Sequence, residues 1–147
     1  MISLDDAIVI AQRFCRGDWW DLAEGVNGLY FRTSTTGYIA LARRIQHRTN
    51  IAKSVLAEEL GHHWTTPPGV YGPLFSFTER TSLCRAEQRA VCWAADWLIG
   101  DTDMLYIGRH LAEINCLDQL SEFMRIFGVT REIVIMKWLS MKTRGVV

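Results

Sequence analysis

The sequence lacks the features that mark several common classes of protein. Its 147 residues contain no internal repeat, linker or low-complexity segment, and no apolar run is long enough to cross a bilayer. Lys and Arg together number 16, as do Asp and Glu, and a net charge of zero argues against binding nucleic acid by electrostatic attraction. We therefore expect residues 1–147 to form a single domain with a hydrophobic core.

The cysteine pairs typical of metal and redox motifs are also absent. The four cysteines, at positions 15, 84, 92 and 116, form no Cys-x-x-Cys motif. The chain begins with Asp5 and Asp6 in a region where a signal peptide would be basic, so we expect a cytoplasmic protein. In that reducing compartment the cysteines are expected to be buried free thiols.

Helical and β-prone segments predict an α+β fold that is mainly helical. The β-prone segments 28–33 and 38–42 flank a turn, which predicts a small antiparallel sheet. We expect this sheet to pack on the helix at 49–64. The expected helices and helical pieces lie at 3–17, 19–25, 49–64, 81–99, from 101 onward, 118–127 and 130–142.

Residues 57–63 place two carboxylates and two imidazoles in the middle of one predicted helix. Residues four apart share a helix face, so Glu58 and His62 point the same way and Glu59 lies one step around. This is the geometry of the His-Glu-x-x-His zinc motif, with Glu58 in the first ligand position and Glu59 in that of the general base.

Glu87 lies in the apolar stripe of the next long helix, 25 residues after His62. A carboxylate in an apolar stripe needs a cation, a hydrogen-bond donor or a metal. A metal held by Glu58, His62 and Glu87, with water as fourth ligand, would account for these polar side chains together. The alternative is an amphipathic helix whose carboxylates pair with arginines. The candidate partners are Arg43, Arg44 and Arg85.

Residues 56–63, Leu-Ala-Glu-Glu-Leu-Gly-His-His, resemble the motif helix of the ImmA/IrrE metallo-endopeptidases. These are gluzincin-like proteins of prophages, mobile elements and stress responses. Residues 87–94 are similar to the helix that carries the third ligand in that family. Weaker similarity covers the sheet at 28–41 and the closing helices at 120–130, so the resemblance extends from about residue 25 onward.

The resemblance implies a metal-dependent endopeptidase that cleaves a helix-turn-helix transcriptional repressor of a prophage or mobile element. Such an enzyme would act as an antirepressor. The resemblance places the metal on Glu58, His62 and Glu87 and the general base on Glu59.

The metal expected at this site is Zn²⁺. Because the carboxylate of Glu58 is a harder ligand than an imidazole, Mn²⁺ is the alternative, and a metal-free protein is a third possibility. His63 and Tyr71 are expected just outside the ligands, where they would support them from behind.

Two functions of other classes remain open. A pseudo-peptidase of the same fold would bind a repressor or another protein without cutting it. The feature that favours this interpretation is Glu58, which stands where the zinc motif has a histidine. Residues 117–142 also read as helix, turn and helix, as in a DNA-binding module. We rank DNA binding below the peptidase, because the second helix is mostly apolar, and expect no direct contact with nucleic acid or membrane. The polar residues of that helix include Arg131, Glu132 and Lys137.

Overall fold

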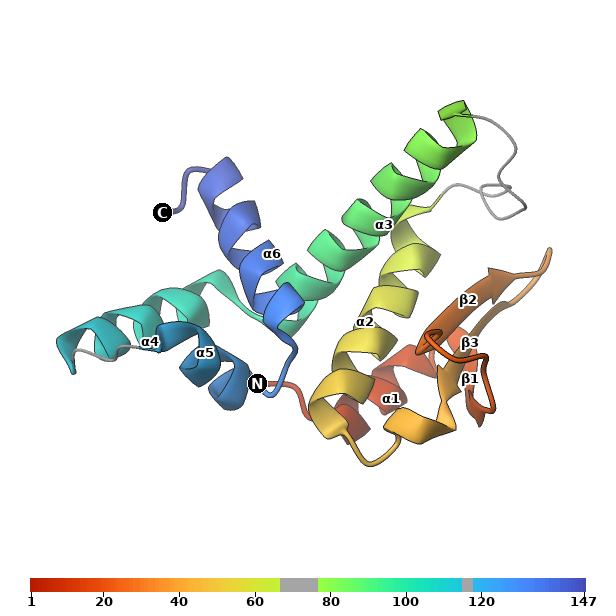
Figure 1. The fold of residues 1–147 in the computed structure, drawn as a ribbon, viewed down its shortest axis with the longest axis horizontal. Coiled ribbons are helices and arrows are strands. Elements are labelled where there is room, and N and C mark those ends of the chain that lie inside the picture. Colours follow the sequence, from red (N-terminus) through yellow and green to blue (C-terminus); the bar gives the residue numbers. More distant parts are fainter. Residues whose placement is uncertain (67–76, 115–117) are drawn as a thin grey trace.

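The computed structural model describes residues 1–66, 77–114 and 118–147, with residues 77–83 described by their backbone alone. The architecture is α+β, as predicted: a small sheet lies at one side of the molecule and helices form the rest (Figure 1). In chain order the elements are α1 (Leu4–Ala11), β1 (Cys15–Trp20), β2 (Gly28–Arg32), β3 (Gly37–Ala42), the short 3-10 helix η1 (Arg43–Ile45), α2 (Thr49–Thr65), α3 (Phe77–Leu98), α4 (Asp101–Glu113), α5 (Gln119–Phe127) and α6 (Arg131–Thr143).

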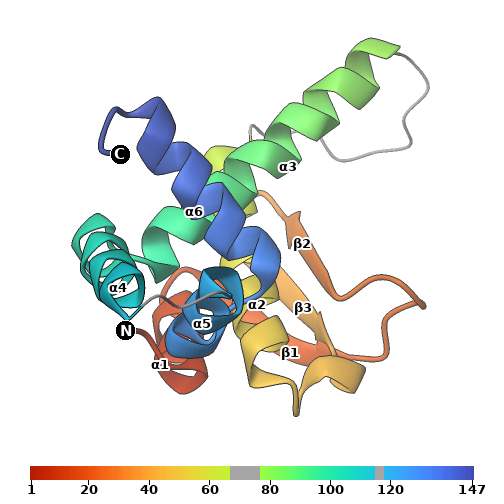
Figure 2. The same cartoon turned by 60° about the vertical axis from the view of Figure 1, so that its left-hand side comes forward.

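Helix α2 lies between the sheet and α3, and the other elements are arranged around this pair (Figure 1). Its Leu56 and Leu60 are buried with α1 and the sheet, whereas Ala57 is buried with α3 and the C-terminal helices. Helices α4, α5 and α6 lie on the side away from the sheet (Figure 2). Helix α2 is therefore covered on two faces, and its polar site residues lie on the face that is left.

The sheet is mixed rather than antiparallel, with strand order β1-β3-β2. The predicted hairpin is confirmed, because β2 and β3 pair antiparallel with Tyr30 opposite Ile39. The prediction of a helical piece around Trp19 and Trp20 is wrong: β1 runs parallel to β3, with Trp19 opposite Leu41. Local sequence could not reveal this pairing, because parallel strands meet only through a distant part of the chain.

Several helix boundaries follow from capping residues that the sequence shows. The Ser3 hydroxyl accepts a hydrogen bond from the Asp6 N–H at 3.1 Å, which starts α1 as predicted. Helix α1 then ends at Ala11, well before the predicted end near residue 17. Asp118 caps α5, and Gly128 ends it with the left-handed conformation (φ 59°) expected of a C-terminal glycine. Helix α3 begins at Phe77, earlier than predicted, and the predicted loop falls largely on residues 67–76, outside the described part.

Two polar side chains of α2 fix the turn between α5 and α6. The buried ammonium of Lys53 donates hydrogen bonds to the carbonyls of Phe127 at 2.6 Å and Ile2 at 3.0 Å. The Ser54 hydroxyl accepts a hydrogen bond from the Thr130 N–H at 2.9 Å. The bonds to Phe127 and Thr130 satisfy backbone groups at helix ends, where no partner exists within the helix itself. The start of α6 is therefore tied directly to α2.

The cysteines only partly match the expectation of buried thiols. Cys15 is buried, Cys92 is half-buried and Cys84 is exposed, and all three are free. Cys116 lies outside the described residues. None of the described helices combines the length and apolar character that a bilayer crossing requires.

Gly61 sets the distance between α2 and α3. A Cβ atom at this position would lie 2.5 Å from the carbonyl oxygen of Ala90 and 3.0 Å from its Cα. Such distances are far inside van der Waals contact, so the two backbones can meet only because residue 61 has no side chain. The neighbour whose close approach this glycine permits is α3.

We predict that Gly61→Ala destabilises the protein by about 1–3 kcal/mol, because the added methyl group forces the two helices apart. The matched control is Gly108→Ala in α4, where the new Cβ would make an ordinary contact of 3.6 Å with Phe123. That control should instead stabilise by up to about 1 kcal/mol, from helix propensity alone. Urea unfolding measures both changes, and a stabilising Gly61→Ala would contradict the close contact.

Candidate metal centre

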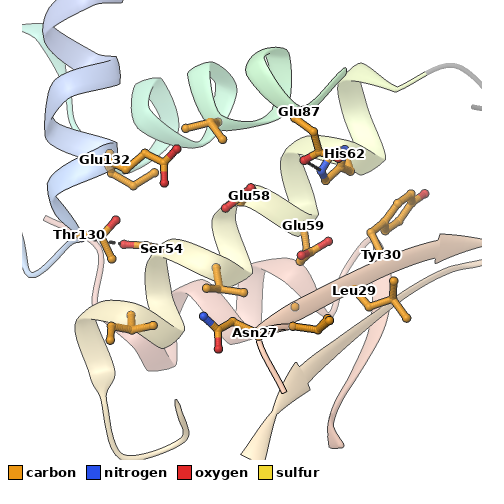
Figure 3. A pocket seen from close by; sticks show the side chains of 17 residues that line it. Asn27, Leu29, Tyr30, Ser54, Glu58, Glu59, His62, Glu87, Thr130 and Glu132 are labelled. Carbon is orange, nitrogen blue, oxygen red and sulfur yellow. Dashed lines mark hydrogen bonds and ion pairs between the residues drawn. The ribbon is translucent and has the colours of Figure 1, made fainter. Parts of the chain in front are cut away.

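Three possible metal ligands from α2 and α3 meet in the structure (Figure 3). One ligand atom from each of Glu58, His62 and Glu87 lies within 4.8 Å of the other two. The first two side chains stand one turn apart on α2, and α3 supplies the third. Two carboxylates and one imidazole are donors that suit Zn²⁺ or Mn²⁺. The described residues could therefore hold a divalent cation where the sequence places one.

His62 is buried and held at both of its ring nitrogens. Its Nδ1 lies 3.0 Å from the hydroxyl oxygen of Thr66, and its Nε2 lies 3.0 Å from a carboxylate oxygen of Glu87. Burial alone would lower the pKa of His62, but the hydrogen bond and charge of Glu87, with the charges of Glu59 and Glu58, raise it overall. A cation would take over the role that the imidazole proton plays beside these carboxylates.

Thr66 is a site residue that the sequence interpretation missed. It orients the imidazole through the nitrogen that faces away from Glu87, as partners behind metal-binding histidines commonly do. The spacing of four residues from His62 was available as a clue. The residue was overlooked because it lies at the end of the helix, where position alone does not fix the direction of a side chain.

The carboxylate of Glu58 has neither a hydrogen bond nor an ion pair in the described part of the chain. It is half-buried between α2 and the C-terminal helices, and it points into the cleft (Figure 3). Burial raises its pKa, and the negative charges of Glu132 and Glu87 raise it further, against the opposing effect of His62. A carboxylate that lacks a protein partner in this setting is well suited to a cation.

Glu59 points from α2 toward β2, beside the three ligands rather than among them (Figure 3). A Cβ on Gly28 would overlap its carboxylate and would come within 2.5 Å of Val55, so this glycine makes the room that Glu59 occupies. Burial, reinforced by the charges of Glu58 and Glu87, raises the pKa of Glu59 to about 7, although the charge of His62 and a hydrogen bond from the Tyr30 backbone oppose this. The carboxyl group therefore exchanges its proton near neutral pH.

The four side chains line a cleft of about 520 Å³ between β2 and the start of α6. Strand β2 is an edge strand of the sheet. Asn27 and Thr33 make their backbone hydrogen bonds on the side of β2 that faces β3. Because the direction of the backbone N–H and C=O groups alternates along an antiparallel ladder, those of Gly28 and Arg32 point away from β3. One wall of the cleft is thus the edge of a sheet.

The arginines that were alternative partners for the carboxylates bind elsewhere. Arg43 donates a hydrogen bond to the carbonyl of Trp19 at 3.1 Å, and Arg44 donates to the carbonyls of Leu22 and Val26. Arg85 is exposed and has no ion pair among the described residues. The pairing of the α2 carboxylates with Arg43 or Arg44 is therefore wrong. Arg44 instead holds the loop before β2, which lines the cleft.

The two supporting residues proposed from the sequence have different outcomes. His63 lies on the sheet side of α2, where its Nδ1 is 3.0 Å from the Tyr30 hydroxyl and its ring packs edge-on against Trp64. It therefore reaches the site through Tyr30, whose backbone bonds Glu59. Tyr71 lies outside the described residues.

No protein-family model matches the chain, and neither curated proteins nor solved structures include a match to it. The resemblance to the ImmA/IrrE family therefore stays a prediction from the motifs.

We predict a specific pH dependence for protein that has been stripped of metal with a chelator. The pKa of Glu59 is about 7 in the folded chain, above the value of 4.5 for a glutamate exposed to water, so the folded state binds more protons than the unfolded state between these values. The free energy of unfolding should therefore fall as the pH rises through this range, by on the order of 3 kcal/mol from Glu59 alone. Glu59→Gln should remove that part of the loss.

Urea unfolding of the wild type and of Glu59→Gln at pH 5 and pH 8 measures this difference. The comparison between the two proteins cancels the titration of groups that both retain. Parallel stability profiles would show that Glu59 is not held in a buried, proton-retaining environment.

Proposed function

We propose that this protein is a metal-dependent endopeptidase. The observation that carries the proposal is the meeting of Glu58, His62 and Glu87 within one cleft, with Glu59 beside them and close to an edge strand. These are the parts that hydrolysis of a peptide bond needs: a cation site, a proton acceptor and a surface that can hold an extended chain. The resemblance to the ImmA/IrrE motif agrees with this arrangement.

The site residues have different roles in the proposed reaction. When bound by Glu58, His62 and Glu87, a divalent cation supplies a Lewis acid that favours ionisation of water and polarises a carbonyl. Glu59 accepts a proton from the attacking water and returns it to the leaving amine. Burial raises the pKa of Glu59 in the metal-free chain, and a bound cation would lower it, which favours the carboxylate form that accepts the proton.

The substrate is proposed to be a segment of protein in extended conformation. A peptide laid along β2 would continue the sheet and gain main-chain hydrogen bonds from the edge that faces away from β3. The resemblance adds the class of protein: a helix-turn-helix repressor, whose cleavage would release the genes that it silences. We propose such a repressor as the natural substrate.

A metal-free protein-binding regulator is the second candidate function. The observation in its favour is the direct contact of 3.0 Å between His62 and Glu87, which lets these two side chains satisfy each other without a cation. In such a protein the cleft would hold an extended segment of a repressor without cutting it.

DNA binding through α5 and α6 has less support. Lys137, one of the few basic residues of α6, is buried and pairs with Asp96 at 2.8 Å and with Asp101 at 2.6 Å. An ammonium that is engaged inside the protein cannot reach a base edge in a DNA groove.

We predict that protein purified without chelators contains one equivalent of zinc or manganese, measured by elemental analysis. Glu87→Ala should lose the metal, because two protein ligands hold a cation far less tightly than three. Glu113→Ala, which removes an exposed carboxylate at the end of α4, should retain it. Failure to bind metal even after reconstitution would favour the metal-free regulator.

We predict that Glu59→Gln keeps the fold and the metal but lowers the rate of peptide cleavage by roughly 10²–10⁴-fold, because the amide cannot accept a proton. The substrate for this assay is a peptide mixture of random sequence, with products read by mass spectrometry. Circular dichroism and metal content serve as controls for folding. A Glu59→Gln protein with full activity would rule out the proposed mechanism.

A further inference from the structure

The charge of the cleft is one-sided. Four carboxylates line it, those of Glu58, Glu59, Glu87 and Glu132, and no lysine or arginine of the described residues does. In the proposed function, a divalent cation neutralises the charge of its two carboxylate ligands, and Glu59 accepts the proton of the attacking water. One negative charge, that of Glu132, then has no assigned role.

Glu132 stands at the opposite side of the cleft from β2. It lies in the first turn of α6, and its side chain points across the cleft toward Glu58 (Figure 3). It is exposed and has no hydrogen bond or ion pair within the described residues. The hydrogen bonds of Lys53 and Ser54 to the α5–α6 turn fix the helix that presents it. The backbone that carries Glu132 is therefore fixed beside the cleft, and its carboxylate has no partner among the described residues.

The cleft around Glu132 also has an apolar lining. Aliphatic side chains from α2, α3 and α6 contribute to it, and two of them, Val91 and Ile133, are buried. Ile51 lines the cleft as well, whereas Val55 lies against Gly28 of β2, on the other side of the cleft. A ligand that suits this arrangement has an aliphatic stem for the wall and a cationic end for the exposed carboxylate. Lysine and arginine side chains have this form.

We propose that Glu132 and the aliphatic side chains beside it form a subsite for a lysine or arginine side chain of the substrate, next to the bond that is cut. Glu132 is the specificity-determining residue of this subsite. The inference rests on the proposed function, because it places the subsite beside the cation, and it adds a substrate class: segments with a basic residue at a fixed position.

Hydroxamates of single amino acids test the subsite without requiring catalysis. The hydroxamate group binds zinc, so it anchors each probe at the centre, and acetylation of the α-amine leaves the side chain as the only cation. We expect zinc-loaded protein to bind Nα-acetyl-lysine hydroxamate about fivefold more tightly than the norleucine analogue, which lacks only the ammonium. Calorimetry measures both dissociation constants.

Variants of Glu132 show whether that preference comes from this residue. Glu132→Gln should bring the ratio of the two dissociation constants to about one, and Glu132→Lys should favour Nα-acetyl-glutamate hydroxamate instead. Glu113→Gln, a change of the same kind on α4, should leave the ratio as in the wild type. Zinc content is measured in every variant, so that loss of the metal is not mistaken for loss of the subsite.

Each of the other outcomes has one meaning. Equal binding of the lysine and norleucine probes to the wild type would overturn the subsite and leave the proposed function intact. Absence of binding by every hydroxamate to protein that contains zinc would count against the proposed function itself. The last outcome concerns norleucine hydroxamate with a free α-amine. If the wild type binds it more tightly than the acetylated form and Glu132→Gln does not, the carboxylate binds a peptide amino terminus, which would overturn the side-chain assignment.

Discussion

The close contact between α2 and α3 at Gly61 is the constraint on which the candidate centre depends. The donor atoms of the candidate ligands lie within 4.8 Å of one another, and the two helix backbones approach until the carbonyl of Ala90 sits where a side chain of residue 61 would be. The same contact decides more than the position of Glu87. Helix α6 packs on α3 and is also hydrogen-bonded to α2 at its start, so the far wall of the cleft depends on both helices. The lack of a side chain at Gly61 thus affects both the candidate centre and the wall of the cleft opposite the sheet.

That packing brings together side chains that repel one another. Burial and mutual repulsion raise the pKa values of Glu58 and Glu59, so these carboxylates would ionise more easily in water than where they are. Sequences rarely retain such a cluster for the sake of stability, and sites that violate the ordinary rules of burial are commonly functional. A divalent cation relieves the conflict, because it supplies the positive charge that the described part of the cleft lacks apart from His62.

The sequence predicts those parts of the structure that local rules determine. Ser3, Asp118 and Gly128 mark helix ends through bonds within a few residues, and the spacing of Glu58 and His62 fixes a common helix face. Strand β1 was missed because its pairing with β3 is a property of two distant segments. The contribution of Gly28 was invisible for the same reason, since the side chain that it accommodates comes from α2. Glu87 was found because a carboxylate within an apolar stripe is unusual, and because residues 87–94 resemble the third-ligand helix of the ImmA/IrrE family.

The bonds from Lys53 and Ser54 have a consequence for how the molecule assembles. They join α2 to backbone groups 74 and 76 residues further along the chain. During synthesis, which proceeds from the N-terminus, the sheet and the motif helix emerge long before the segment that covers that end of α2. Until then a buried ammonium and a hydroxyl have no backbone partners from that segment, and the cleft is open on one side. The nascent chain therefore carries the candidate cation ligands before it carries Glu132. Under the proposed function, metal binding and substrate selection would become possible at different stages of its folding.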